Sequence, residues 1–225
     1  MTAVSAILLA AGESRRMGEL NKLTLPVAGV PLLRRTASIL LASGLGEIVV
    51  VVGHEEQVAR ALLDDLPVRL VSNPRYAQGQ MTSVYRGMEA LSEPCKGVMV
   101  CLSDQALLEV DDINRLVGAF LHRCPTSVLV PTWQGRRGNP IIVAWQHRAA
   151  ILGGAHNLGC KRLIQHNPDL VTPLEMDNDH VVFDLDTPED YQRLLQRLRS
   201  GEVGSEPWGA AGQRGGVLNV NGEGR

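Results

Sequence analysis

The chain has 225 residues, of which 44% are hydrophobic and 20% are charged, a composition that suits one soluble globular domain with a substantial core. Its formal net charge of -2 provides no overall basic field, so we expect no nucleic-acid partner. No apolar run is long enough to span a bilayer, and the first residues lead directly into a predicted strand rather than a leader peptide. We therefore expect a cytoplasmic protein without a membrane partner.

The first predicted element is a buried parallel strand, because residues 6–11 form an unbroken apolar run. The run ends at Gly12; Ser14, Arg16 and a second glycine follow at alternate positions, with Lys22 a little further on. Glycines let the backbone approach a ligand closely and present N–H donors to phosphate oxygens, while Arg16 and Lys22 supply the positive charge that a triphosphate requires. An ordinary strand-to-helix turn with solvated basic residues is the alternative. The tight spacing of these groups favours nucleotide binding.

This stretch resembles the signature of the MobA-like nucleotidyltransferases, and more narrowly that of the branch containing molybdenum cofactor cytidylyltransferase. The similarity begins with Leu9-Ala10-Ala11-Gly12-x-Ser14-x-Arg16-Met17-Gly18 and Lys22, and it extends from about residue 4 to about residue 198. The resemblance implies catalytic roles for Arg16 and Lys22. It also implies a nucleotide-binding segment made of Leu9, Ala10, Ala11, Gly12, Ser14, Arg16 and Lys22.

Beyond the first loop, predicted helices and strands alternate. Pro31 is expected to occupy the first position of a helix. The largely apolar segments at 47–53 and 68–71 are expected to be strands, and a helix is expected between them. This alternation predicts a Rossmann-like α/β fold with a doubly wound, mostly parallel sheet, and the resemblance narrows it to the nucleotide-diphospho-sugar transferase type. Ligands of such sheets bind at the carboxyl ends of the strands, so functional residues should follow each apolar run.

The third predicted strand leads into a polar segment that opens a helix. Asn73 begins this segment, and a glycine, an amide and two hydroxyls between Gly79 and Ser83 provide a neutral surface rich in donors. Thr82 or Ser83 could instead act only as the helix N-cap, and the residues alone leave the two interpretations about equal. The family resemblance favours the first, and it implies that Asn73, Gly79 and Ser83 lie around the nucleotide.

Asp104 follows a predicted strand at 97–102. It could cap the next helix. Opposite a phosphate-binding loop, however, we favour a magnesium ligand, because Mg²⁺ typically takes one or two protein carboxylates together with phosphate oxygens. The resemblance matches Asp104 to the metal-binding aspartate of the family, which also contacts the nucleotide and takes part in catalysis.

A second acidic motif lies near residue 186. Asp184 and Asp186 are two apart on a segment that we expect to be extended, so they share one face. Thr187 and Asp190 then suit the N-cap and capping-box positions of the next helix. By resemblance to the family motif Asp-x-Asp-Thr-Pro-Glu-Asp, Asp186 is expected to be the second metal ligand, with Asp184 as its substitute.

Two arginines between glycines follow another predicted strand, at 127–131. They could form no more than an exposed hairpin tip. The segment resembles the Arg-Gly-His/Asn-Pro stretch by which relatives enter the acceptor side of the cleft, and an anionic pterin phosphate needs local cations. We therefore favour an acceptor-binding role for Arg137, Gly138 and Asn139.

The sequence has no internal repeat, and we expect one nucleotidyltransferase domain at 1–200 followed by a disordered, glycine-rich tail at 201–225. The leading hypothesis is a Mg²⁺-dependent transfer of CMP from CTP to a molybdopterin-type molybdenum cofactor, with release of pyrophosphate. A GTP-dependent guanylyltransferase and a transferase for another phosphate acceptor are alternatives. A further alternative is a chaperone that binds molybdenum cofactor and inserts it into a partner molybdoenzyme.

Overall fold

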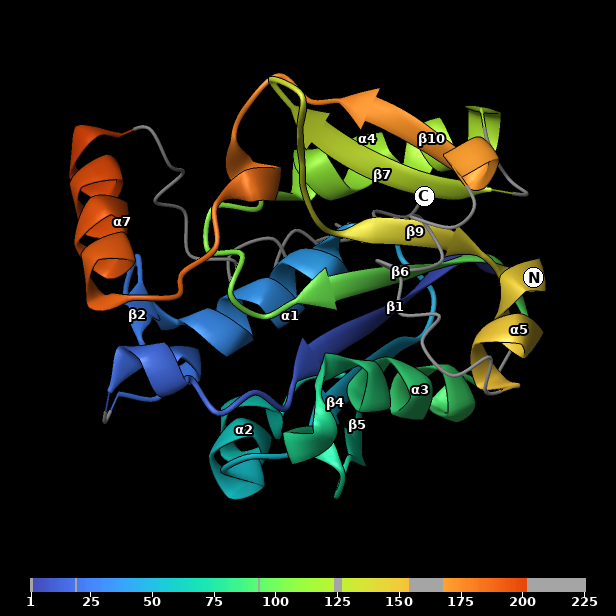
Figure 1. Ribbon diagram of the computed structural model, residues 1–225. Coiled ribbons are helices and arrows are strands. Elements are labelled where there is room, and N and C mark those ends of the chain that lie inside the picture. Colours follow the sequence, from blue (N-terminus) through green and yellow to red (C-terminus); the bar gives the residue numbers. More distant parts are fainter. Residues whose placement is uncertain (1, 19, 93, 124–126, 154–167, 202–225) are drawn as a thin grey trace, which may run out of the picture.

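The computed structural model describes residues 2–18, 20–92, 94–123, 127–153 and 168–201, and a mixed sheet forms its centre (Figure 1). In this described part the sheet follows the order β10-β7-β9-β6-β1-β4-β5, and β8 pairs with β7. β9 is antiparallel to both of its neighbours, whereas the other pairs in this order are parallel. The predicted α/β fold with a doubly wound, mostly parallel sheet is confirmed. The strands are β1 (Thr2–Ala10), β4 (Ile48–Val52), β5 (Arg69–Ser72), β6 (Cys95–Leu102), β7 (Val128–Trp133), β8 (Arg136–Arg137), β9 (Ile141–Ala144) and β10 (Val171–Glu175), and a separate hairpin is formed by β2 (Pro26–Val27) and β3 (Val30–Pro31).

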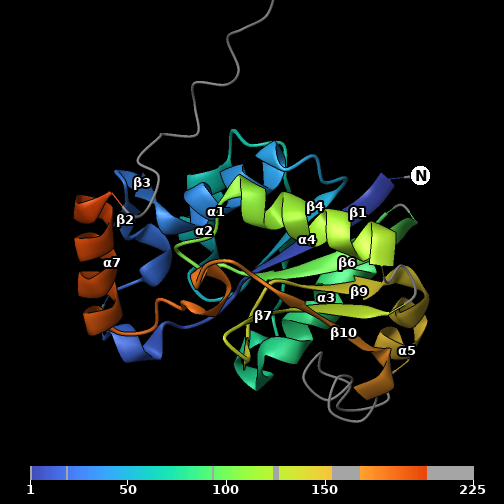
Figure 2. The same cartoon turned by 90° about the horizontal axis from the view of Figure 1, so that it is seen from above.

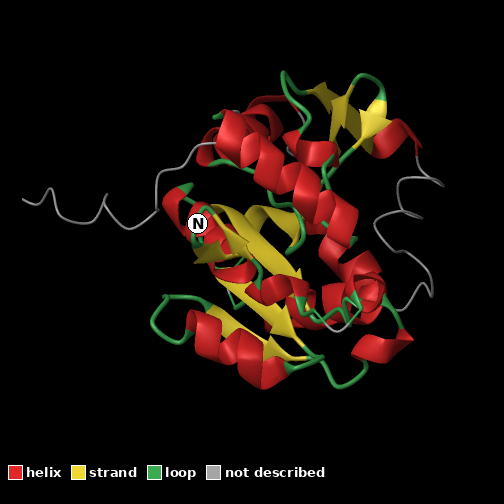
Figure 3. Ribbon diagram, turned by 90° about the vertical axis from the view of Figure 1, so that its left-hand side faces the viewer, coloured by secondary structure: helices red, strands yellow, loops and turns green. Residues whose placement is uncertain are grey.

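Helices cover both faces of the sheet (Figures 2 and 3). One face carries α1 (Leu32–Ala42), α2 (Glu56–Leu63) and α4 (Val110–Arg123), and the other carries α3 (Gln80–Ala90) and α5 (Arg148–Leu152). α7 (Pro188–Ser200) lies beside the β2–β3 hairpin, beyond the carboxyl ends of the parallel strands at the left of Figure 1. Short 3-10 turns connect these elements at η1 (Arg15–Met17), η2 (Lys22–Thr24), η3 (Tyr76–Gln78), η4 (Trp145–His147), η5 (Pro168–Leu170) and η6 (His180–Val182). Within the described ranges, no helix combines the length and the apolar character needed to cross a membrane.

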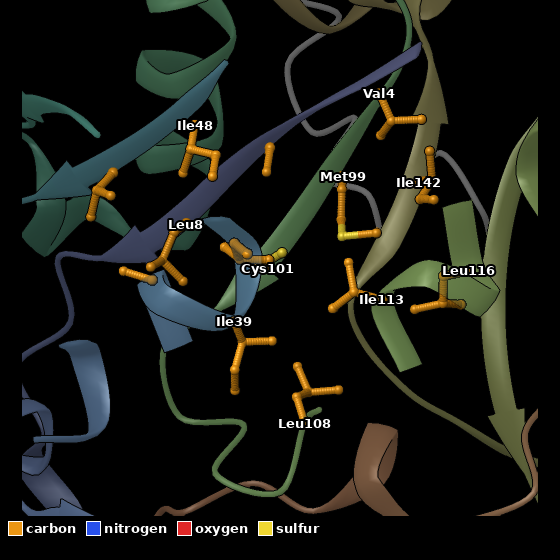
Figure 4. Packing of buried hydrophobic residues seen from close by; sticks show 14 of the residues in the cluster. Val4, Leu8, Ile39, Ile48, Met99, Cys101, Leu108, Ile113, Leu116 and Ile142 are labelled. Carbon is orange, nitrogen blue, oxygen red and sulfur yellow. The ribbon is translucent and has the colours of Figure 1, made fainter. Parts of the chain in front are cut away.

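From Val4 to Ala10, the side chains of β1 alternate between the two faces of the sheet and are buried on both. Leu8 belongs to a cluster with Ile39 of α1 and Ile113 of α4 (Figure 4), whereas Ile7 belongs to the opposite cluster with Met88 of α3. None of these five side chains is more than 2% exposed. A strand that is buried on both faces needs apolar residues at successive positions, which explains the unbroken run near the start of the sequence.

The order of the strands places a topological switch point beside β1. From β1 the chain moves outward through β4 and β5, and it then returns by α3 to β6 on the opposite side of β1. In doubly wound sheets, ligands bind in the crevice outside the carboxyl ends of the strands at such a point. Leu9 near the end of β1 pairs with Leu102 at the end of β6, so the two loops that follow these strands start side by side.

The structure differs from the sequence-based prediction at several element ends. Pro31 is the N-cap of α1 rather than its first helical residue, because it pairs with Pro26 and keeps an extended backbone. The segment at 183–186 follows a 3-10 turn and forms no strand. β10 was not predicted, because this half-exposed edge strand contains a proline and lacks a continuous apolar run. The predicted tail lies outside the described residues from residue 202 onward.

Candidate active site

The loop after β1 forms one wall of a cleft at the switch point. Ser14 has a left-handed backbone (φ 51°), which a residue with a side chain rarely adopts, and it starts the turn η1. The backbone N–H of Met17 donates to the Ser14 carbonyl at 2.8 Å, and the Met17 side chain is buried. This anchored turn holds Arg16 at the mouth of the cleft, where 69% of its side chain is exposed.

Four charged side chains form an alternating chain across the cleft. Arg16 Nη2 lies 2.7 Å from Asp186 Oδ2, and the ammonium of Lys22 lies 3.3 Å from Asp186 Oδ1. Lys22 Nζ is also 2.7 Å from Asp104 Oδ2. The Lys22 and Asp104 side chains are only 13% and 17% exposed, so this contact is weakly screened by water. The structure therefore brings together the two predicted catalytic cations and two of the predicted metal ligands.

Asp184 is the third carboxylate of the cleft. Desolvation by the surrounding protein, followed by the negative charges of Asp104 and Asp186, raises the pKa of Asp184 to about 6. Among the described residues, Oδ1 of Asp104 is buried and has no hydrogen-bond partner. Concentrated negative charge and an unsatisfied carboxylate oxygen are both features of a cation site.

The described residues contain no group of three or more His, Cys, Asp or Glu side chains arranged to hold a metal ion. In one kind of metal site the protein supplies all the ligands, and in a second kind the substrate completes the coordination. Mg²⁺ commonly takes one or two carboxylates and completes its coordination with phosphate oxygens and water. Asp104 and Asp186 fit this second kind of site, in which the nucleotide supplies the remaining ligands.

Buried apolar residues next to each charged group hold the cleft together. Met17 follows Arg16, Ala106 follows Asp104 by two positions, and Leu185 separates the two aspartates of the second motif. All three are at most 3% exposed and belong to one cluster with Leu194 of α7. Because Leu185 is directed into this cluster, its two neighbours can face the cleft although the segment is not a strand.

Three adjoining cavities open at this site. The central cavity, of about 350 Å³, is lined by Leu9, Ala11, Gly12, Arg16, Lys22, Leu23, Tyr76, Gln80, Ser83, Leu102, Ser103, Asp104, Asp184 and Asp186. The loop cavity, of about 320 Å³, is lined by Glu13, Ser14, Arg15, Arg16, Lys22, Tyr76, Ala77, Gly79 and Asp186. The third cavity, of about 520 Å³, is called the hairpin cavity because it adjoins the hairpin formed by β7 and β8. It is lined by Arg16, Arg136, Asp179, Val182, Phe183, Asp184, Asp186, Thr187, Asp190 and Arg193. Most residues of the predicted nucleotide-binding set thus line the first two cavities.

Asn73 and Ala10 lie behind the cavity walls instead of lining them. Ala10 is 1% exposed and belongs to the apolar core. Asn73 is 2% exposed, and its amide donates to the hydroxyls of Thr82 and Ser83 at 2.9 Å each. Gly79 is the N-cap of α3, so the alternative in which Thr82 or Ser83 caps the helix is wrong. Asn73 therefore positions the start of α3, including Ser83, from below the surface.

The predicted acceptor segment is arranged differently from the expectation. Arg136 lines the hairpin cavity, whereas Arg137, Gly138 and Asn139 line none of the three cavities described above. Neighbouring residues of a strand point to opposite sides, so only one arginine of β8 can face this space. Two further residues that line these cavities, Tyr76 and Arg193, were not predicted from the sequence. The available signals were the aromatic residue that follows a predicted strand and the basic residue one turn after the acidic motif.

The MobA-like NTP transferase domain, a known protein family, matches residues 6–171 of this chain. The chain belongs to this family. The matched range contains the loop after β1, Asp104 and β8, whereas Asp184 and Asp186 follow it. Family membership makes the protein a nucleotidyltransferase-type enzyme, and it agrees with a cleft in which cations and carboxylates alternate.

Three proteins are similar in sequence to this MobA-like transferase over most of its length. Nicotine blue oxidoreductase of Paenarthrobacter nicotinovorans is 30% identical over 198 residues, which cover 85% of this chain and 96% of that protein. Purine catabolism protein PucB of Bacillus subtilis is 30% identical over 205 residues, with coverages of 85% and 96%. Molybdenum cofactor cytidylyltransferase of Escherichia coli is 26% identical over 212 residues, with coverages of 88% and 98%.

Solved structures show the same fold. Rv0371c of Mycobacterium tuberculosis has a TM-score of 0.76 at 23% identity, covering 87% of this chain and 100% of that one. A complex of Rv0371c with manganese has a TM-score of 0.71 at 21% identity, with coverages of 87% and 99%.

Gly138 directly follows the β7–β8 hairpin of this MobA-like transferase and lies against the turn η6. The N–H of Asn139 donates to the Val181 carbonyl at 2.9 Å, and Nε2 of Gln105 donates to the same carbonyl at 3.2 Å and to the Asn139 carbonyl at 2.7 Å. A Cβ atom on Gly138 would lie 2.8 Å from the carbonyl carbon of Val181 and still closer to its oxygen. The missing side chain therefore allows the hairpin to hold the turn that precedes the acidic motif.

Gly138→Ala should lower the free energy of unfolding by about 1–3 kcal/mol, the usual cost of overpacking, and should also slow turnover by displacing the acidic motif. Denaturant unfolding followed by circular dichroism measures the first effect. Gly118→Ala is the matched control, because a Cβ there would meet no atom within 4 Å. In the interior of α4 this second change should stabilise the protein by about 0.5–1 kcal/mol. Equal stability of Gly138→Ala and the wild type would contradict the crowding at Val181.

Proposed function

We propose that this chain transfers CMP from CTP to a phosphate monoester of the molybdopterin type and releases pyrophosphate. The observation that carries the proposal is the meeting of three cavities at Arg16 and Asp186, which line all of them. A nucleoside, its outer phosphates and an acceptor need adjoining spaces around one reacting phosphorus atom. The central, loop and hairpin cavities supply these spaces in that order.

The charged residues suit this transfer. An oxygen of the acceptor phosphate forms a bond to the α-phosphorus of CTP. At the same time, the bond between this phosphorus and the α,β-bridging oxygen breaks, and pyrophosphate leaves with the electron pair. Arg16 and Lys22 neutralise the charge on the departing group. A phosphate acceptor is already anionic near neutral pH and needs no base. In agreement, the described residues that line the central cavity include no histidine or glutamate.

Asp104 and Asp186 would hold Mg²⁺, with Asp184 as the substitute ligand, and the ion would balance phosphate charge when bound. The unpartnered Oδ1 of Asp104 and the raised pKa of Asp184 support this assignment. Lys22 already lies at hydrogen-bond distance from both Asp104 and Asp186, so the cationic and acidic groups converge on one space. Rv0371c, a protein of the same fold, has been solved as a complex with manganese, and this agrees with the use of a divalent ion.

The choice of CTP is supported by Ala11. This residue lines the central cavity and is 4% exposed. Its methyl group fills space that a glycine would leave open, which favours the smaller pyrimidine base over guanine. GTP is the alternative donor.

The molybdopterin-type acceptor is supported by the similarity to the cytidylyltransferase of Escherichia coli, which spans 98% of that protein. Relatives at 30% identity carry other functional names. The acceptor class is therefore inferred from this relative together with the cavity beside the acidic motif.

The test is Mg²⁺-dependent pyrophosphate release with CTP or with GTP, in the presence and absence of molybdenum cofactor. Release over many turnovers with CTP and cofactor is the expected result. Release with GTP instead would overturn the role of Ala11, and release with another phosphorylated acceptor would overturn the molybdopterin assignment. Tight retention of cofactor without any pyrophosphate release would favour a chaperone that serves a molybdoenzyme partner.

A further inference from the structure

We infer that the acceptor docks in the hairpin cavity, where Arg136 of β8 and Arg193 of α7 hold its phosphate group. The inference rests on the proposed nucleotidyl transfer and extends it to a specific pair of residues. Arg16, Asp184 and Asp186 line both this cavity and the central cavity. A phosphate bound between the two arginines would therefore adjoin the space proposed for the α-phosphate.

Aspartates also line the hairpin cavity, but most of them already have cationic partners. The ion pairs join Asp179 to Arg197, Asp186 to Arg16, and Asp190 to Arg193. Asp179 receives two hydrogen bonds from Arg197, at 2.7 and 2.8 Å, so its charge is well balanced. These pairs reduce the repulsion that four carboxylates would otherwise exert on an anionic ligand.

Arg136 adds a positive charge to the cavity and takes part in none of these ion pairs. No side-chain hydrogen bond or ion pair joins it to another described residue, although its charge acts on Asp184 across the cavity. It is an exposed residue of β8, opposite Trp133 in the strand register. A guanidinium at this position can offer its N–H groups to a phosphate in the paired geometry that arginine favours.

Arg193 faces the same space from the opposite element. Its side chain is 66% exposed, and its contact with Asp190 uses the single nitrogen Nη2. A guanidinium carries five N–H donors, so donors remain for a second anion. The lining of this cavity therefore includes one arginine from β8 and one from α7, and this pair is the clamp inferred for the acceptor phosphate.

The experiment measures binding of phenyl phosphate, a simple phosphomonoester, by calorimetry. Saturating α,β-methylene-CTP and Mg²⁺ fill the nucleotide and triphosphate positions first, so that the probe cannot occupy them. Arg136→Gln and Arg193→Gln should each weaken phenyl phosphate binding by about tenfold or more, as expected for a lost charge-assisted hydrogen bond, with affinity for the nucleotide analogue unchanged. Arg193→Lys should restore part of the loss.

Arg199→Gln is the matched control, because it removes an exposed arginine from the same helix outside the cavity. It should bind the probe as the wild type does. Unchanged probe affinity in both Arg136→Gln and Arg193→Gln would overturn the inference. So would the absence of probe binding to the analogue-loaded wild type, or a loss caused by Arg137→Gln but not by Arg136→Gln.

Binding and turnover separate this inference from the proposed function. If the arginine variants lose probe binding but no acceptor yields pyrophosphate, the clamp is supported and the proposed transfer fails. If the wild type transfers CMP and both variants keep the same KM for the acceptor, the transfer is supported and the clamp fails.

Discussion

Replacing Lys22 with methionine should lower kcat/KM for nucleotidyl transfer by about 10²–10³-fold, the range seen when one preorganised electrostatic group is lost. The ammonium of Lys22 lies 2.7 Å from Asp104 and 3.3 Å from Asp186 in a partly buried cleft. Its removal leaves two carboxylates facing the phosphates without this cation. Steady-state kinetics of pyrophosphate release measures the loss.

The fold should survive this change, because the next residue, Leu23, is 2% exposed and anchors the segment in the core. Circular dichroism and thermal unfolding can confirm this. Lys96→Met is the matched control, since Lys96 is an exposed lysine of β6 outside the three cavities. The control should keep wild-type kinetics. A Lys22→Met enzyme with near-normal kcat/KM would remove Lys22 from the proposed chemistry.

Asp104→Asn should reduce turnover by about 10²-fold or more and raise the Mg²⁺ concentration needed for half-maximal rate. A bound metal can supply several kcal/mol of charge stabilisation at a phosphoryl group, and each 1.36 kcal/mol corresponds to about tenfold in rate. The asparagine keeps the shape of the side chain but loses the charge that would attract the ion. A Mg²⁺ titration at saturating CTP measures both quantities.

Asp111→Asn serves as the control for this second prediction. Asp111 is an exposed residue in the first turn of α4 and lines none of the three cavities. It should leave the Mg²⁺ dependence unchanged. An Asp104→Asn enzyme with a wild-type Mg²⁺ titration would contradict the assignment of Asp104 as a ligand, whatever its residual turnover.

Local sequence predicted the features that short-range physical chemistry determines. The apolar run ending at Gly12 predicted the buried strand β1 and the loop that follows it, because such a strand needs apolar residues on both faces. Thr187 and Asp190 predicted the start of α7, and the structure contains the complete capping box between them. These features depend on neighbouring residues, so their spacing is visible without a tertiary structure.

The direction in which individual side chains point could not be predicted from the local sequence. The sequence shows two adjacent arginines, but only the pairing of β8 with β7 determines that Arg136 lines the hairpin cavity. Asn73 similarly matched a binding segment, yet its amide holds two hydroxyls of α3 from beneath the surface. Both outcomes depend on which face of an element is covered, and that is decided by packing against distant segments.

The sequence by itself determined the fold class, the glycine-containing loop after the first strand and the acidic residues that follow later apolar runs. Tertiary structure alone decided their convergence, since Lys22 contacts Asp104 and Asp186 although they lie 82 and 164 positions away in the chain. The order of strands brings the ends of β1 and β6 together, and the apolar cluster around Leu185 carries the acidic motif to the same place. Both arrangements arise from burial of apolar surface between segments far apart in sequence, which no local pattern specifies.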